Sequence, residues 1–443
     1  MSAQSLMDVY QQARAQDSQY GAARSALEAA LEKLPQARAG LLPAASVSAN
    51  KNLQIGDGAF SGDAYSGVPS VSREIRSWNW TAQLVQPVFR LSNWLAYVQA
   101  DAQVAQAKEQ FTLAEQDLVV RSAQVYFDVQ VAMQSVQVAE AQLQAINEQL
   151  TLAQRTFEVG MGTITDVHEA KAKQALNLAQ RVSALNDLTA KQAELEKLIG
   201  NYVSLPPIQL AKSLPALEPT RVDDWLALAM THNPQIRIQQ AALLVAEKEV
   251  AKTMSAHAPT LDVVSNRAAS YNSGSLSTPA DLATRVNSHQ TGLQLTVPLF
   301  SGGATQSKVR EAVALEQKAK DDLTGAQRSA SSLVRQTFAG VLNGQAQVDA
   351  LEAAVEASQN SVESNKIGFK IGTRINPDVL NAEQQLYTTL RDLSKARVDA
   401  VMQGLKLKAT AGSLSADDLQ LIERLMIPAA NATHVAKSNG RDF

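Results

Sequence analysis

The chain has 443 residues, of which 45% are hydrophobic and only 5% aromatic, and its formal net charge is −3. This apolar content excludes a wholly disordered chain, and the low aromatic content favours long helices with thin apolar seams. The weak net charge gives no reason to expect a nucleic-acid partner, because phosphate binding needs a concentrated basic patch. Cysteine is absent, which excludes disulfides, cysteine zinc sites and a lipid anchor on an N-terminal cysteine.

The first residues, Met1-Ser2-Ala3-Gln4, lack the basic and apolar regions of a secretory signal peptide. We therefore expect either a cytosolic protein or a mature chain without its signal peptide. No run of about eighteen apolar residues occurs, so the sequence predicts no transmembrane helix.

Short alternating segments follow an N-terminal helix and predict β-strands at about residues 44–55 and 76–90. Trp78, Trp80 and Leu84 alternate with the polar Asn79, Thr81 and Gln83, so one face of this strand is apolar and the other polar. Between the two strands, Gly56–Gly62 has the composition of a solvent-exposed hairpin loop.

Two long helices are predicted next, at about residues 91–159 and 164–199, because no proline occurs between Pro87 and Pro206. The first would be about 100 Å long at 1.5 Å per residue, which no ordinary globular core requires. Its apolar seam has the three- and four-residue spacing of a coiled coil. The seam consists of Val129, Ala132, Val136, Ala139, Leu143, Ile146, Leu150, Ala153 and Phe157.

The second half of the chain repeats this plan. Strands are predicted at about 260–272 and 286–300, with a loop at Ser273–Pro279, and long helices at about 301–370 and 377–411. We divide the chain into repeats 1–212 and 213–427, followed by a tail, 428–443, that we expect to be flexible. One offset aligns the ends of both helical hairpins, matching Phe157 with Phe369, Gly160 with Gly372, Asp166 with Asp378 and Val167 with Val379.

Four strands of this kind have two interpretations. Alternation alone is typical of the half-buried sheet of a soluble protein. Combined with the duplicated hairpins and the Trp78/Trp80 pair at a strand end, it favours an outer-membrane barrel, which four strands cannot close alone. Twelve strands from three chains would leave an aqueous lumen, whereas eight would be filled by side chains. The residues expected to face lipid are Trp78, Trp80, Leu84, Leu293 and Leu295.

The sequence resembles the TolC family of outer-membrane efflux and secretion ducts over about residues 5–425. The resemblance rests on the order, spacing and duplication of several short strings. They include Leu6–Arg14, Gln86-Pro87-Val88-Phe89, Ile199-Gly200-Asn201-Tyr202, Asn233-Pro234, Val297–Gly303 and the two hairpin tips.

The resemblance implies a mainly α-helical protein with a membrane β-barrel. Three chains would form a twelve-stranded barrel in the outer membrane, continued into the periplasm by a barrel of long helices. It further implies a passive duct that receives exported proteins or drugs from a periplasmic adaptor and an inner-membrane transporter, either ABC-type or proton-driven. The resemblance leaves the cargo open.

The hairpin tips are the gate and the adaptor docking site in this family. Asp166 and Arg374 match tip residues that can pair, and Asp378 matches an acidic ring around the pore axis. Asn381 stands where a second acid is found, and Phe369 replaces a tyrosine. The docking positions are Gly160, Met161, Gly162, Thr163, Gly372 and Thr373. The competing interpretation makes Asp166 and Arg374 helix-capping residues or a surface pair, and Asp378 an acid that stabilises a helix start through the helix dipole.

The sequence predicts no catalytic residues, no cofactor and no metal site. The five histidines have no i, i+4 pairing. Ser301-Gly302-Gly303 lacks the Gly-Lys-Ser/Thr of a phosphate loop, and no Gly-x-Ser-x-Gly motif is present. We expect a channel and not an enzyme. The alternative is a soluble coiled-coil scaffold, which would stay monodisperse without detergent.

Overall fold

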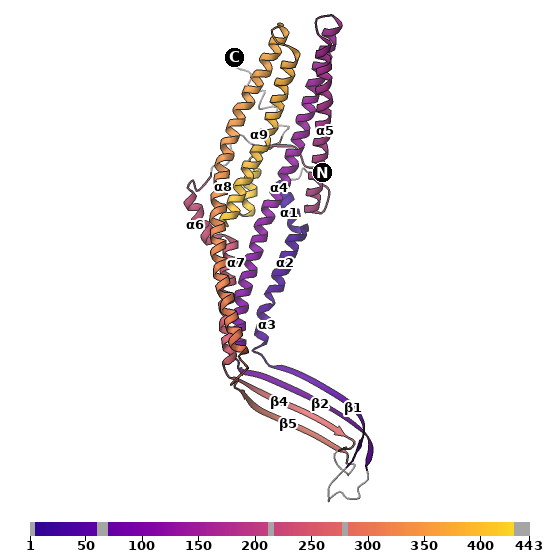
Figure 1. Cartoon of the computed structure of the whole chain (residues 1–443), viewed down its shortest axis with the longest axis vertical. Coiled ribbons are helices and arrows are strands. Elements are labelled where there is room, and N and C mark those ends of the chain that lie inside the picture. Colours follow the sequence, from indigo (N-terminus) through magenta and orange to yellow (C-terminus); the bar gives the residue numbers. More distant parts are fainter. Residues whose placement is uncertain (1–4, 60–69, 211–216, 277–281, 429–443) are drawn as a thin grey trace. The chain divides into compact units, whose positions relative to one another are not determined.

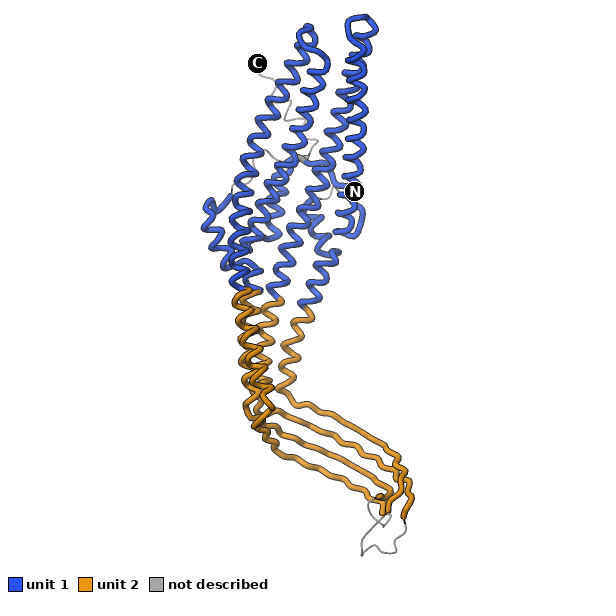
Figure 2. Tube along the Cα trace, viewed as in Figure 1, with its two compact units in different colours: residues 1–27, 108–238, 323–443 blue, residues 28–107, 239–322 orange. Residues whose placement is uncertain are grey.

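The computed structural model describes residues 5–59, 70–210, 217–276 and 282–428. The chain divides into two compact units, which are shown in Figure 2. Unit 1 comprises residues 1–27, 108–238 and 323–443, and unit 2 comprises residues 28–107 and 239–322. Each unit contains segments from both halves of the chain, so the compact units do not coincide with the two sequence repeats. The predicted tail after residue 428 lies outside the described residues.

Unit 2 contains a four-stranded antiparallel sheet with the order β1-β2-β4-β5 (Figure 1). The strands are β1 (Ala44–Gly58), β2 (Val71–Phe89), β4 (Thr260–Asn272) and β5 (Thr284–Thr296). β1 and β5 therefore form the two edges of the sheet within one chain. A bulge between Pro87 and Phe89 shifts the pairing of β2 with β4, as expected where proline cannot donate a hydrogen bond.

Three strand boundaries differ from the sequence-based prediction by three residues or more. β1 runs to Gly58 and β2 begins at Val71 and not at residue 76, because the pairing of these strands continues as far as Gly58 opposite Val71. β5 ends at Thr296 and not at residue 300, since Pro298 has no N–H to extend the ladder.

The strands lead into helices within unit 2. α3 (Lys33–Ala39) precedes β1, and the first part of α4 follows β2. At this junction Arg90 holds Asp262 of β4 through two hydrogen bonds of 2.7 Å, and the Asp262 carboxylate is buried. A paired, charge-assisted contact of this kind fixes the angle between the groups it joins.

The long helices cross from unit 2 into unit 1. They are α4 (Leu91–Glu158) and α8 (Ala304–Lys370), and each returns through a shorter helix, α5 (Ile164–Ile199) or α9 (Asn376–Ala411). α8 begins three residues later than predicted, because Gly302 and Gly303 have φ values of 62° and 80°, outside the helical region. No helix among the described residues is long and apolar enough to cross a membrane.

In unit 1, α4 packs beside α5 and α8 beside α9, giving two helical hairpins (Figure 1). Seven of the nine predicted seam residues of α4 are buried, and only Leu143 and Phe157 are not. The matching seam of α8 includes Gly344, where an added Cβ would lie 3.3 Å from that of Ala400. The absence of a side chain at Gly344 therefore brings α8 close to α9.

The main core of unit 1 joins the ends of these hairpins to short helices. Phe127 of α4, Ile199 of α5 and Met402 of α9 lie in one buried cluster with residues of α1 (Leu6–Gln16) and α10 (Ala416–Glu423). Trp225 of α6 (Val222–His232) is buried in a second cluster against Val334. α2 (Ser18–Leu31), α7 (Pro234–Met254) and a small sheet of β3 (Ile208–Leu210) with β6 (Met426–Pro428) complete the described structure.

Candidate functional site

The first hairpin tip is a closely hydrogen-bonded turn. Gly160 has φ 74°, and the Met161 N–H donates to the Thr156 carbonyl at 2.8 Å, which ends α4 in a left-handed cap. Thr163 and Asp166 then start α5 with a reciprocal capping box, in which the Asp166 carboxylate accepts from the Thr163 N–H at 3.1 Å. The Asp166 carboxylate also accepts from the Thr163 hydroxyl at 2.8 Å, so its Oδ2 already has two local donors.

The second tip has the same outline with fewer contacts. Gly372 has φ 78°, and Thr373 N–H donates to the Gly368 carbonyl at 2.9 Å. The Asp378 carboxylate accepts a long bond, 3.5 Å, from the Ile375 N–H. Isoleucine has no side-chain acceptor for the Asp378 N–H, so the reciprocal bond of a capping box is missing. The Arg374 guanidinium lies 3.7 Å from the Asp378 carboxylate and its side chain is 59% exposed. The charges of this tip therefore interact only weakly with their own helix.

Within one chain the structure does not bring Asp166 and Arg374 together. Each interacts with its own hairpin, Asp166 with Thr163 and Arg374 with Asp378. Phe369 is half-buried near the end of α8. The predicted Asp166–Arg374 contact therefore requires either a movement of the hairpins or a neighbouring chain.

Apolar side chains are exposed at both tips. Met161 is 84% exposed at the first tip, and Val159 beside it is also exposed. Ile371 and Ile375 expose a comparable surface at the second tip. Exposed apolar groups grouped at a turn mark an interaction site more often than isolated ones do. Of these four residues, only Met161 is among the docking positions predicted from the sequence.

The two hairpins meet through a polar layer that the sequence analysis missed. Lys173 of α5 donates to Asn381 and to Gln384 of α9, both at 2.8 Å. Asn381, predicted as a pore position, therefore contacts the other hairpin in this chain. Nearby, the buried Glu383 pairs with Lys366 at 2.7 Å. Polar residues at seam positions that would ordinarily be apolar were the available sequence signal.

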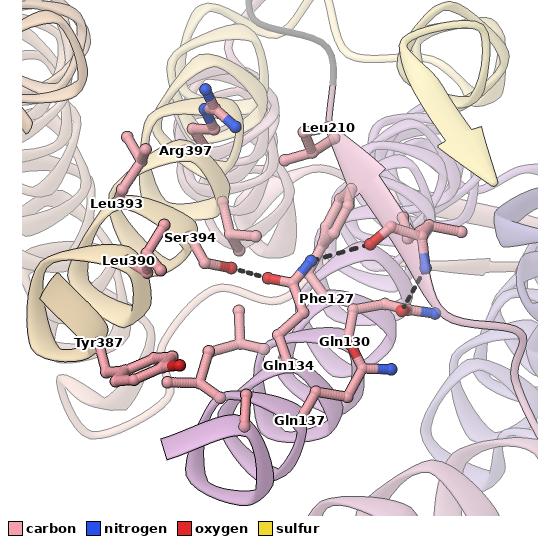
Figure 3. A pocket seen from close by; sticks show the side chains of 15 residues that line it. Phe127, Gln130, Gln134, Gln137, Leu210, Tyr387, Leu390, Leu393, Ser394 and Arg397 are labelled. Carbon is pink, nitrogen blue, oxygen red and sulfur yellow. Dashed lines mark hydrogen bonds between the residues drawn. The ribbon is translucent and has the colours of Figure 1, made fainter. Parts of the chain in front are cut away.

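Figure 3 shows a cavity of about 360 Å³ between α4 and α9, bordered by β3. Gln134 crosses it, donating to the Ile208 carbonyl at 2.8 Å and accepting from the Ser394 hydroxyl. Burial raises the pKa of Tyr387 on its wall, and the charge of Glu383 raises it further. The walls are mainly apolar with glutamines, and no grouping of three potential metal ligands occurs in the described part of the chain.

The sheet has two chemically distinct faces. The register places the predicted lipid-facing residues on one side, here called the tryptophan face: Trp78, Trp80, Leu84, Leu293 and Leu295. The opposite side, the glutamine face, carries Gln83, Gln290 and Gln294. In the described rows from Ser77 to Val85 of β2, the glutamine face has no charged residue on any strand.

The comparisons with known proteins agree with this architecture. A profile described as "Outer membrane efflux protein" matches residues 9–201 and 225–413. The alkaline protease secretion protein AprF of Pseudomonas aeruginosa is 32% identical over 94% of this chain and 86% of its own length. The outer membrane protein TolC of Vibrio cholerae is 29% identical over 94% and 92%. The crystal structure of the outer membrane protein VceC of the same species superposes with a TM-score of 0.75 over 92% and 96%, at 19% identity.

Proposed function

Because the chain belongs to the outer membrane efflux protein family, we propose that three copies assemble into the outer-membrane duct of a tripartite export system. The observation that carries this proposal is the four-stranded sheet, which has a face with exposed tryptophan and leucine side chains, a polar face without charge from Ser77 to Val85, and two edges left open within the chain. Lipid does not tolerate open edges, so strands shared among chains must close the barrel. Twelve shared strands enclose a lumen wide enough for water.

In this duct the tryptophan face contacts lipid and the glutamine face lines the lumen. The helical hairpins continue the passage into the periplasm. The chain contributes no energy and no catalysis; a periplasmic adaptor and an inner-membrane transporter deliver the cargo. This arrangement is supported by the family and by the chemistry of the two sheet faces, and it corresponds to an outer-membrane protein.

The hairpin tips serve as gate and docking site in this proposal. Asp166 of one chain pairs with Arg374 of its neighbour, and three copies of Asp378 gather around the axis. Exposed apolar groups at the tips support adaptor docking, and they extend the docking set of Gly160, Met161, Gly162, Thr163, Gly372 and Thr373 to Val159, Ile371 and Ile375. Asn381 and Phe369 leave this closure with one acidic ring and no tyrosine hydroxyl.

We propose secreted polypeptides as the principal cargo. AprF is named as an alkaline protease secretion protein, and its match covers nearly the whole chain. The uncharged glutamine face also suits an extended polypeptide of either charge, because it presents hydrogen-bonding groups without fixed charges. Small-molecule efflux is the second candidate, supported by the description of the family.

The mass of the purified protein in detergent tests the assembly, and planar bilayer recording tests the channel. A trimer that conducts ions is expected. A folded monomer that conducts, or a protein that stays monodisperse without detergent, would contradict the proposed duct. Cargo is tested by deleting the gene and measuring exported protease and drug sensitivity separately.

A further inference from the structure

Basic side chains gather on the tryptophan face of the sheet. Lys51 of β1, Arg267 of β4, and Arg285 and His289 of β5 all lie on this face. The acids of this face within the described strands are Asp57 and Glu74, both nearer the loop end, and Glu74 pairs with Arg76 at 2.7 Å. A lipid-facing surface would ordinarily exclude such charges, so their positions need an explanation.

Three of these basic side chains have no carboxylate partner among the described residues: Lys51, Arg267 and Arg285. Arg267 stands directly opposite His289 across β4 and β5, so the guanidinium and the imidazole present hydrogen-bond donors side by side. A bound phosphate could accept from both.

Arg285 is held beside aromatic rings. Its guanidinium lies 6.0 Å from the centre of the Trp78 ring, and Trp78 stacks on Tyr271 at 6.3 Å. Tryptophan and tyrosine are enriched where a membrane meets water, since one end of each ring system is apolar and the other polar. This cluster therefore has the composition of a membrane interface.

Lys51, Arg267 and His289 lie at the same distance from the end of their strand that is joined to a helix. The separation is seven residues in each case, about 24 Å along the strand. The hydrogen-bonded rows are offset, since Lys51 lies opposite Trp78 and Arg267 opposite Ala82. Equal separations give one depth in a barrel whose tilted strands bring their helix-side ends to one level. The pairs are Lys51 and Ala44, Arg267 and Thr260, and His289 and Thr296.

Exposed aromatic residues mark the other limit of the apolar band. Phe89 lies eleven residues after Trp78, and Phe300, which is 89% exposed, lies eleven residues after His289. The eleven residues from Trp78 to Phe89 lie within β2 and span about 36 Å, or about 25 Å when tilted by about 45°, which is the height of the apolar band of an outer-membrane barrel. The exposed Leu84, Leu293 and Leu295 lie between these limits. The cations therefore lie at the edge of the band nearer the loops.

Resting on the proposed outer-membrane function, we propose that Lys51, Arg267, Arg285 and His289 bind the phosphate groups of lipid in the outward-facing leaflet. The guanidinium groups supply paired hydrogen bonds to phosphate oxygens, and Lys51 supplies a point charge. Trp78 and Tyr271 lie at the same depth, at the boundary between the apolar band and the lipid headgroups. The duct is thereby fixed in depth by lipid headgroups as well as by its apolar band.

The test uses the purified full chain in detergent, titrated with bis-phosphorylated lipid A. Native mass spectrometry counts bound lipid, and the thermal unfolding midpoint reports stabilisation. Phosphorylated lipid A is expected to bind and raise the midpoint, whereas dephosphorylated lipid A and inorganic phosphate leave both readouts unchanged. The Arg267→Gln/Arg285→Gln variant should bind at least about tenfold more weakly, because charge-assisted hydrogen bonds are lost.

The matched control is Arg328→Gln/Lys395→Gln, which removes the same charge from exposed positions of α8 and α9. It should bind lipid A like the unaltered protein. Trimer mass and conductance are measured first without lipid A, so failure there counts against the proposed duct. If the variants are conducting trimers and bind lipid A with unchanged affinity, or if dephosphorylated lipid A binds equally well, the phosphate site is wrong. If the double variant does not assemble, Lys51→Gln alone tests the phosphate site. It should weaken lipid A binding several-fold, and unchanged binding would contradict the site.

Discussion

The four-stranded sheet and the hairpin tips use interactions of very different strength. On the sheet, alternate residues face opposite environments, and a charge moved to a lipid-facing position costs about 2–4 kcal/mol near the bilayer centre. At the tips, the exposed Arg374 and the half-buried Asp378 are 3.7 Å apart, and pairs near the surface contribute about 0–1 kcal/mol. In the proposed duct, the cost of placing a charge in lipid fixes the position of the sheet in the membrane. The ion pairs at the tips are weak enough for the gate to open and close reversibly.

The largest effect is expected from a charge on the tryptophan face. Leu84→Arg should raise the free energy of membrane insertion by about 2–4 kcal/mol if Leu84 lies near the membrane centre. The yield of trimer should fall as a result. Its neighbour Gln83 lies on the glutamine face, so Gln83→Arg should assemble normally and shift ion selectivity toward anions. Leu295→Arg and Gln294→Arg form the same pair on β5. Equal damage at neighbouring positions would refute the assignment of the faces.

The next effect compares the two tips. Asp166 completes a capping box, whereas Asp378 accepts one bond of 3.5 Å, so Asp166→Ala should destabilise its helix start by about 1 kcal/mol and Asp378→Ala by less. Hydrogen exchange of the tip amides measures this difference. Protection should fall about fivefold around Thr163 in the first variant and less around Ile375 in the second. Identical losses would mean that the two tips are equally capped.

A smaller effect is expected at Arg374. In the proposed trimer it bridges to Asp166 of a neighbouring chain, so Arg374→Ser should favour the open gate and raise single-channel conductance. Three exposed pairs acting together shift the equilibrium several-fold. Bilayer recording provides the measurement, with Arg391→Ser, an exposed position on α9, as the control. Unchanged conductance in Arg374→Ser would place closure elsewhere.

The smallest effect concerns divalent cations. Three Asp378 carboxylates around an axis would supply the oxygen ligands that such ions prefer, so Asp378→Ala should weaken block from the periplasmic side. Asn381→Asp should strengthen it by adding a second acidic ring. Asp392→Ala, at an exposed site on the same helix, should leave block unchanged. If divalent-cation block is the same in Asp378→Ala and Asn381→Asp as in the unaltered protein, Asp378 does not line the pore.

Much of the secondary structure could be predicted because local residues determine it. α5 begins after Thr163 and ends before Gly200, positions at which a side-chain cap and a left-handed glycine are required. β5 and α8 were predicted less well, since Pro298 and the Gly302-Gly303 pair separate them by a non-regular segment. The pairing of β3 with β6 joins segments more than two hundred residues apart, which local patterns do not indicate.

The site residues were predictable to a different degree. The alternation of side chains along β2 was enough to place Trp78, Trp80 and Leu84 on one face. The strand register adds Leu293 and Leu295 to the same face. The contacts of Asn381 with Lys173 depend on how two hairpins pack, so the sequence could not reveal them. The placement of Arg267 opposite His289 likewise follows from the register of two strands and not from either strand alone.

The open edges of β1 and β5 also determine how the protein would behave genetically. In the proposed trimer each chain completes the barrel of its two neighbours, so a chain with one defective edge still occupies a place in the assembly. If equal amounts of normal and defective chains mix freely, only about one trimer in eight contains three normal chains. A defect in either edge strand is therefore expected to be dominant over the normal gene.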